Sequence, residues 1–191
     1  MTLRRSGITI VAACLTALVI ATGCLPFPLG DPAQSKVDSK LVGFWLNDSA
    51  EDRDLIALYP YDEHTYLMQD QKLHQEDGKW APQGPPTIYK AWLTEVKGHR
   101  FICLDPLFQK VVPQEHNFYP ALLVEPVAEG LKTRLVNADF EPLKAAKSAA
   151  DELAIITKEI ENPKLFDESQ STFRHLDAEK DQDTIQFVVK S

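Results

Sequence analysis

Residue types that build metal centres and nucleophilic sites are scarce and scattered in this 191-residue chain. It has neither a CxxC nor an HExxH motif, and no two of its histidines are two or four residues apart; they are His64, His74, His99, His116 and His175. It also has no G-x-S-x-G elbow, and its eight glycines form no phosphate-binding loop. The sequence therefore predicts no metal, no cofactor and no enzyme activity. An enzyme would need a polar cluster that only folding brings together in a cleft.

Positive charge is also in short supply, with 20 Lys and Arg against 28 Asp and Glu and a net charge of −8 at pH 7. The first 23 residues contribute two arginines and no acid, so the remaining chain carries −10. Binding to nucleic acid or to anionic lipid surfaces needs basic patches. We therefore expect no nucleic-acid partner, and we interpret the acidic side chains mainly as a solvated surface.

The uncharged apolar run near the N-terminus is short and covers 13 residues, 8–20. At about 1.5 Å per residue it would span about 20 Å, less than the ~30 Å hydrocarbon core of a bilayer. Arg4 and Arg5 precede the run, and the small residues 21–23 follow it. This layout is typical of a secretory signal, so we expect residues 1–23 to be a signal peptide and the protein to be exported.

The stretch ATGC at 21–24 resembles the lipobox of bacterial lipoproteins, with Gly23 directly before Cys24. The resemblance implies that the Cys24 thiol is lipidated and becomes the new N-terminus, and that acyl chains attach the protein to a membrane. Leu25 stands where an Asp tends to retain such proteins in the inner membrane, which favours the periplasmic side of the outer membrane. Two alternatives stay open: acylation at Cys14, or a plain signal peptide followed by an incidental cysteine.

Three prolines and a glycine occur in residues 25–36, LPFPLGDPAQSK. We interpret residues 24–40 as the lipid anchor and a tether, followed by a single domain over 41–191. With Cys14 removed and Cys24 acylated, Cys103 would be the one free thiol. Its place in the apolar run FICLD predicts a buried structural role.

Short apolar segments separated by turn residues between Leu41 and Val136 predict about seven β-strands, over 41–46, 54–59, 65–69, 87–96, 100–107, 118–127 and 131–137. Asp77-Gly78 predicts a hairpin turn, because both residue types tolerate positive φ. The proline-rich residues 81–86 predict a loop. Short connections of this kind indicate an antiparallel meander, which closes most easily into a barrel.

The pattern changes after Val136 and predicts two short helices, over 139–147 and 149–161. Ser148 and Asp151 resemble a capping box, and Asn162-Pro163 ends the second helix. The segment DTIQFVV at 183–189 predicts a last strand that pairs back to close the sheet.

The residues Gly43-Phe44-Trp45 fit the Gly-x-Trp signature of lipocalins and lipocalin-like domains, whose order of strands, helix and final strand is also similar. The resemblance implies that the motif opens the first barrel strand and that Trp45 plugs one end. In that family an Arg packs on the Trp; here Arg174 and Lys190 lie near the C-terminus. We expect a mainly β (α+β) fold: an antiparallel lipocalin-like β-barrel or curved sheet of about eight strands, with two short helices before the last strand.

Aromatic side chains gather in the β part of the chain. Strand alternation places Tyr89 and Leu93 on one face of their strand and Lys90 and Trp92 on the other, and either face could line a pocket. The residues that we expect near a pocket or barrel plug are Trp45, Tyr66, Trp92 and Phe101.

These expectations combine into a non-catalytic envelope lipoprotein, held on a membrane by its lipid, that binds a small apolar ligand or an envelope protein. The alternative is a structural or assembly lipoprotein whose solid barrel binds partner proteins through its outer surface. An internal void of several hundred Å³ would favour ligand binding, and close packing would favour the structural role.

Overall fold

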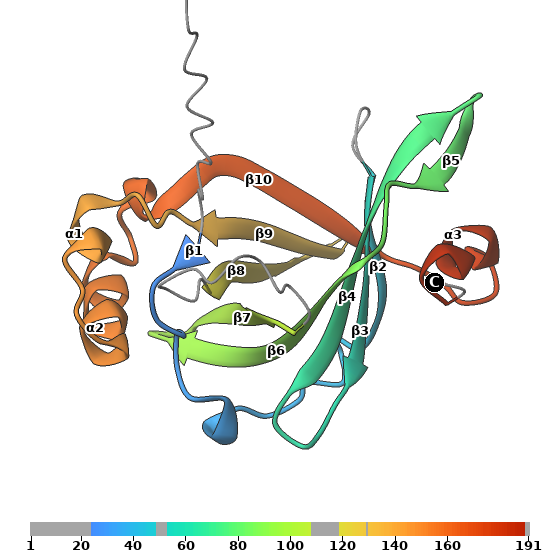
Figure 1. Cartoon of the computed structure of the whole chain (residues 1–191). Coiled ribbons are helices and arrows are strands. Elements are labelled where there is room, and N and C mark those ends of the chain that lie inside the picture. The colour runs from blue at the N-terminus through green and yellow to red at the C-terminus, as the bar shows by residue number, and fades with distance from the viewer. Residues whose placement is uncertain (1–23, 49–52, 108–118, 129, 190–191) are drawn as a thin grey trace, which may run out of the picture.

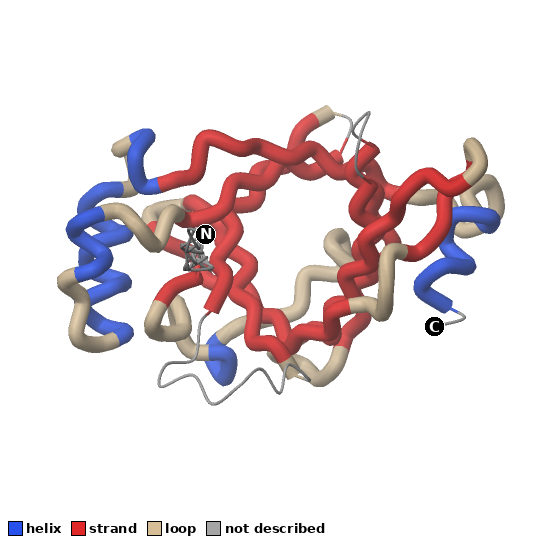
Figure 2. The backbone as a smooth tube through the Cα atoms, turned by 45° about the horizontal axis from the view of Figure 1, so that its top comes forward, coloured by secondary structure: helices blue, strands red, loops and turns tan. Residues whose placement is uncertain are grey.

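Eight antiparallel strands close into a barrel in the computed structural model, which describes residues 24–48, 53–107, 119–128 and 130–189 (Figures 1 and 2). The described residues form ten strands, of which eight make up this ring: β1 (Cys24–Leu25), β2 (Gly43–Asp48), β3 (Arg53–Pro60), β4 (Tyr66–Glu76), β5 (Lys79–Pro82), β6 (Thr87–Val96), β7 (His99–Pro106), β8 (Tyr119–Val127), β9 (Gly130–Val136) and β10 (Phe166–His175). Around the ring the order is β8-β7-β6-β4-β3-β2-β10-β9, and β9 pairs with β8 to close it. The short strands β1 and β5 pair with β8 and β4 outside this ring. The expected fold class, a mainly β antiparallel barrel of about eight strands, is confirmed.

Two tight turns set the register of neighbouring strands. Asp77 and Gly78 have φ angles of 50° and 73°, and Lys97 and Gly98 have 50° and 80°. Positive φ at both central residues gives the turn a twist that matches the flanking strands. The β4–β5 turn thus lies at the predicted Asp-Gly pair. Residues 81–82, expected in a loop, belong instead to β5, an edge strand in which Pro82 is tolerated.

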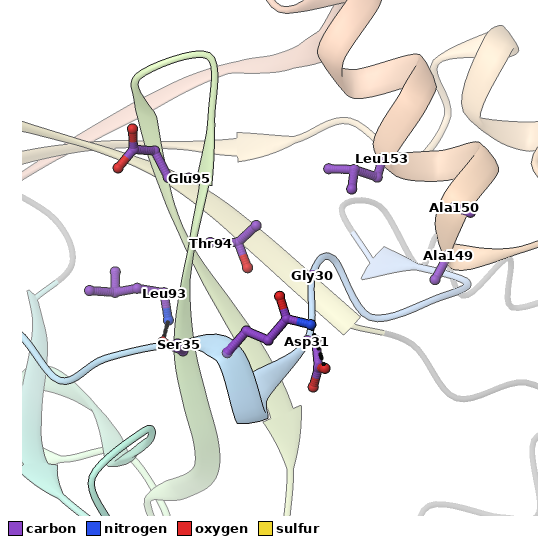
Figure 3. Close-up of a pocket in the computed structure, with 10 residues that line it drawn as sticks. Gly30, Asp31, Ser35, Leu93, Thr94, Glu95, Ala149, Ala150 and Leu153 are labelled. Atoms are coloured by element: carbon purple, nitrogen blue, oxygen red, sulfur yellow. Dashed lines mark hydrogen bonds between the residues drawn. The ribbon is translucent and has the colours of Figure 1, made fainter.

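The segment expected to be a tether packs against the barrel. Leu25 and Leu29 are fully buried, and the Leu29 carbonyl accepts a hydrogen bond from Trp92 Nε1 at 3.0 Å. After the short 3₁₀ helix η1 (Pro32–Gln34), the Ser35 hydroxyl accepts a hydrogen bond from a backbone N–H of β6 at 2.9 Å (Figure 3). Residues 24–40 therefore do not form the free tether that was expected, because Leu25 and Leu29, next to the prolines, are buried against the barrel wall.

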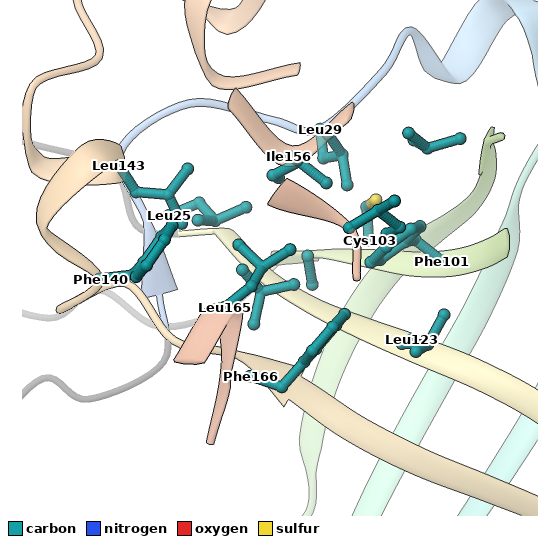
Figure 4. Packing of buried hydrophobic residues seen from close by; sticks show 14 of the residues in the cluster. Leu25, Leu29, Phe101, Cys103, Leu123, Phe140, Leu143, Ile156, Leu165 and Phe166 are labelled. Carbon is teal, nitrogen blue, oxygen red and sulfur yellow. The ribbon is translucent and has the colours of Figure 1, made fainter. Parts of the chain in front are cut away.

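One side of the barrel is covered by helices α1 (Glu141–Lys144) and α2 (Ala149–Glu159). The Ser148 side chain accepts a hydrogen bond from Asp151 N at 3.1 Å, so the predicted N-terminal cap of α2 is present. Side chains from these helices, the N-terminal segment and the outward faces of β6–β9 form a cluster that we call the outer cluster (Figure 4). Cys103 lies fully buried in it, and burial raises the pKa of its thiol to about 12.

The C-terminal segment forms a helix, α3 (Gln182–Val189), where the sequence predicted a strand over 183–189. Ile185 and Val188 are buried against the outward faces of β2–β4, whereas Val189 is 64% exposed. Burial at a spacing of three residues is helical, and a strand would have buried alternate residues. Among the described residues, no helix is both long and apolar enough to cross a membrane.

The strand that closes the barrel is β10, preceded by the 3₁₀ helix η2 (Pro163–Leu165). It pairs with β9 on one edge and β2 on the other. The two predicted helices do precede the last strand, but that strand is 166–175 and not 183–189. Its polar sequence FDESQSTFRH buries only Phe166 and Phe173, so it lacks the apolar runs by which strands such as β3, β7 and β8 are predicted.

Candidate functional site

The barrel strands divide their side chains between an interior and an outer wall. In β3, Asp54, Ile56 and Leu58 point inward, whereas Leu55 and Ala57 are buried on the outside under α3. The same alternation places Tyr89, Ala91 and Leu93 of β6 in the interior and Trp92 in the outer cluster. The interior side chains form a second cluster, which we call the inner cluster.

The barrel interior contains a cavity of about 310 Å³. Most of its lining is apolar, from strands all around the ring: Trp45, Ile56, Leu58, Met68, Tyr89, Ile102, Leu104, Pro120, Leu122, Val124, Leu131, Leu135 and Phe173. Its polar lining consists of Asp54, Asp70, Lys72, Thr133 and Ser171. An apolar cavity with a few polar groups is the usual form of a small-molecule site.

Trp45 lies in the cavity wall and is held from two sides. Its Nε1 donates to the Leu41 carbonyl at 2.9 Å, and the His175 ring packs edge-on against the indole with centroids 4.7 Å apart. Gly43 has a φ of +133°, and a Cβ there would lie 2.5 Å from His175 Nε2. Gly43 therefore leaves space for the His175 ring, and the side chain that packs on Trp45 is His175, where the resemblance implied an arginine.

The inner cluster is covered at one end by the chain before β2. Leu41 packs beside Trp45 and Tyr66. The Tyr66 hydroxyl accepts a hydrogen bond from Asp38 N at 2.5 Å. Asp38 in turn forms an ion pair with Arg100 at 2.8 Å, and the backbone N–H of Lys40 together with Arg100 lowers the pKa of the Asp38 carboxyl. Residues 37–42 thus form a fixed cover on this end of the barrel.

A charged group lies in the cavity wall on β3 and β4. Asp54 faces Lys72 across the two strands, and Lys72 Nζ is 2.7 Å from Asp54 Oδ1. Asp70 also lines the cavity, one inward position from Lys72, and its Oδ1 is buried with no hydrogen-bond partner among the described residues. Removal from water raises the pKa of the Asp70 carboxyl to about 6, against the opposing effect of Lys72.

The four aromatic residues expected near a pocket fall on both sides of the barrel wall. Trp45 lines the cavity, and Tyr66 belongs to the inner cluster beside it. Trp92 and Phe101 belong to the outer cluster and do not line the cavity, because their side chains point outward from β6 and β7. Cys24 starts the described chain as part of β1; its side chain and the predicted signal peptide, 1–23, lie outside the described residues.

Two further features lie on the outside of the barrel. A hollow of about 510 Å³ between η1, β6 and α2 is lined by a mixture of small and polar residues (Figure 3). Glu152 on α2 is fully buried; its Oε2 accepts from Phe27 N at 3.3 Å, and burial raises the pKa of its carboxyl to about 7. This contact ties α2 to the N-terminal segment.

In the part of the chain that the structure describes, no group of three or more His, Cys, Asp or Glu is placed to hold a metal ion.

Comparison of the chain with models of known protein families, with curated proteins and with solved structures finds no match. The strand pairing alone defines the fold, a closed antiparallel barrel.

Proposed function

We propose that this protein is a non-catalytic binding protein that takes up a small, mainly apolar ligand inside its barrel while a lipid on Cys24 holds it at an envelope membrane. The observation that carries the binding proposal is the cavity of about 310 Å³ with its mostly aliphatic lining. A barrel that acts only through its outer surface has no need of such a space, so the structural alternative is less well supported.

The volume of the cavity limits the size of the ligand. An apolar protein cavity of about 150 Å³ takes up benzene, which has six heavy atoms. By proportion, about 310 Å³ accommodates roughly a dozen heavy atoms. Fragments such as an eight-carbon chain with one polar end fit this limit, whereas a whole phospholipid does not.

The position of the N-terminal segment supports a location at the membrane surface. In the β1–β8 ladder Cys24 pairs with Pro120, and Pro120 lines the cavity. Paired Cα atoms in an antiparallel ladder are about 5 Å apart. A lipid on Cys24 would therefore leave the chain beside the cavity, with no flexible spacer between the membrane and the barrel.

Calorimetric titration of the purified soluble domain, residues 24–191, with octan-1-ol tests the binding proposal. We expect saturable binding of one molecule per chain. Ser171→Trp should abolish it, because Ser171 lines the cavity and an indole there occupies much of the space. Thr172→Trp is the matched control, since Thr172 is exposed and should leave the affinity unchanged. Absence of binding to the wild type, or equal binding by the two variants, would refute a ligand site in the barrel.

A further inference from the structure

We propose that the cavity selects ligands with a positively charged or hydrogen-bond-donating head, a primary ammonium on a short apolar chain above all, and that Asp70 binds this head. The inference rests on the proposed ligand-binding function and adds the chemical class of the ligand.

One oxygen of the Asp70 carboxylate lacks a hydrogen-bond partner among the described residues. This atom, Oδ1, is buried in the lining of the cavity. Buried polar atoms without partners are rare in folded proteins, and leaving one unpaired carries a free-energy cost. A ligand that donates to this oxygen removes that cost, so it gains affinity that an apolar ligand cannot gain.

The charged side chains of the cavity wall are more acidic than basic. Three charged side chains line the cavity within the described chain: Asp54, Asp70 and Lys72. Lys72 already lies 2.7 Å from Asp54, and the three together carry one net negative charge when Asp70 is ionised. A carboxylate ligand would place a third negative charge in this group, whereas an ammonium ion neutralises it.

Other cations of the neighbouring strands lie away from the cavity. Arg53 stacks on Trp80 at 4.1 Å, and Arg134 stacks on Phe166 at 4.3 Å; none of these four residues lines the cavity. Arg100 is paired with Asp38 under the cover formed by residues 37–42. Lys72 is therefore the one cation in the described lining, and the polar end of the cavity favours a positive ligand.

The rest of the lining fits the apolar part of such a ligand. Thr133 and Ser171 add two hydroxyl groups to the polar lining. Ile102, Leu122 and Leu131 supply aliphatic walls. An eight-carbon chain with its nitrogen at Asp70 can bury its methylene groups against these walls, and each buried CH₂ adds to the affinity.

The test is a calorimetric comparison of three probes with the same chain and different heads: octylamine, octan-1-ol and octanoate, at pH 7.5. Hydrogen bonds to charged groups contribute about 1.5–3 kcal/mol, so we expect octylamine to bind at least about tenfold more tightly than octan-1-ol, and octanoate most weakly. Asp70→Asn should remove this preference, so that octylamine and octan-1-ol bind the variant with affinities within about twofold of each other. Glu76→Gln, the same charge change on the exposed end of β4, should leave all three affinities unchanged.

A pH series gives a second readout. The other titratable side chains in the described lining of the cavity are Asp54, Lys72 and Tyr89, and Asp54 and Lys72 act electrostatically on Asp70. Because the Asp70 carboxyl ionises near pH 6, octylamine affinity should rise between pH 5 and pH 7.5 in the wild type and stay level in Asp70→Asn.

The outcomes separate the two proposals. If octan-1-ol binds but octylamine binds no more tightly, or if Asp70→Asn keeps the preference for the amine, the selection of a cationic head is refuted and the ligand site stands. If none of the three probes binds, the proposed function itself is refuted.

Discussion

Replacing Asp70 with Asn should stabilise the ligand-free protein, and the gain should depend on pH. The folded state raises the pKa of this carboxyl from 3.8 to about 6 because burial disfavours the charged form. Between these two values the unfolded chain binds fewer protons than the folded one, so the wild type loses stability as the pH rises from about 4 to above 6. Asn has almost the same shape and never ionises, so it avoids this loss.

The size of the effect follows from the shift. Two pKa units at about 1.4 kcal/mol each give roughly 3 kcal/mol as an upper limit. Asp70 is only partly shielded from water. We therefore expect the free energy of unfolding that Asp70→Asn gains over the wild type to be about 2 kcal/mol larger at pH 7.5 than at pH 4. Urea unfolding followed by far-UV circular dichroism at both pH values measures this difference, with Glu76→Gln as the control for a lost surface charge. A gain that is equal at both pH values, or a loss at pH 7.5, would refute a desolvated carboxylate in the barrel.

The remaining predictions concern the barrel plug and the anchor. Gly43→Ala should cost at least about 2 kcal/mol, since a Cβ would collide with the His175 ring at a positive φ; Gly84→Ala, at positive φ in open space, should cost only about 1 kcal/mol. Equal losses in urea unfolding would mean that the His175 contact does not explain the glycine. Trp45→Ala should cost roughly 3–5 kcal/mol by the same assay, and a loss under about 1 kcal/mol would deny the Gly-x-Trp motif any structural role. Cys24→Ser should release the protein from the membrane fraction or leave its signal uncleaved; a variant that stays membrane-bound and correctly processed would rule out lipidation at this residue.

The strands that the sequence predicted best are those whose local pattern and tertiary role agree. The range 87–96 was predicted to the residue as β6, because it is a continuous run rich in apolar and β-branched residues and the Lys97-Gly98 turn ends it. The segment 183–189 misled the prediction, because its β-branched residues favour a strand while their spacing also suits a helix. The helix forms because it buries Ile185 and Val188 against the outward apolar side chains of β2–β4.

The closing strand β10 and the packed N-terminal segment could not be predicted from local sequence patterns, because long-range contacts determine both. Residues 166–175 are polar enough to resemble a loop, and they become a strand because β9 and β2 both need a partner. The prolines of residues 25–36 suggested a tether, but Leu25 and Leu29 are held by long-range contacts that no local pattern encodes.

The site was predictable only in part. Trp45 was found through its motif, whereas an aromatic residue such as Trp92 carries no signal that tells the inside of a barrel from the outside. Asp70 and Lys72 were missed because charged residues usually indicate a solvated face. The available signal was their spacing: residues 68, 70 and 72 point to the same face of β4, and all three line the cavity.

The measurement that tests the central claim most directly is a methyl NMR titration of the soluble domain with octan-1-ol. The account predicts shifts at methyl groups of the cavity lining, such as Ile56, Ile102 and Leu122, with little change at Leu123 and Ile156 in the outer cluster. Spectra that do not change, or shifts confined to the outer cluster, would contradict a ligand site inside the barrel.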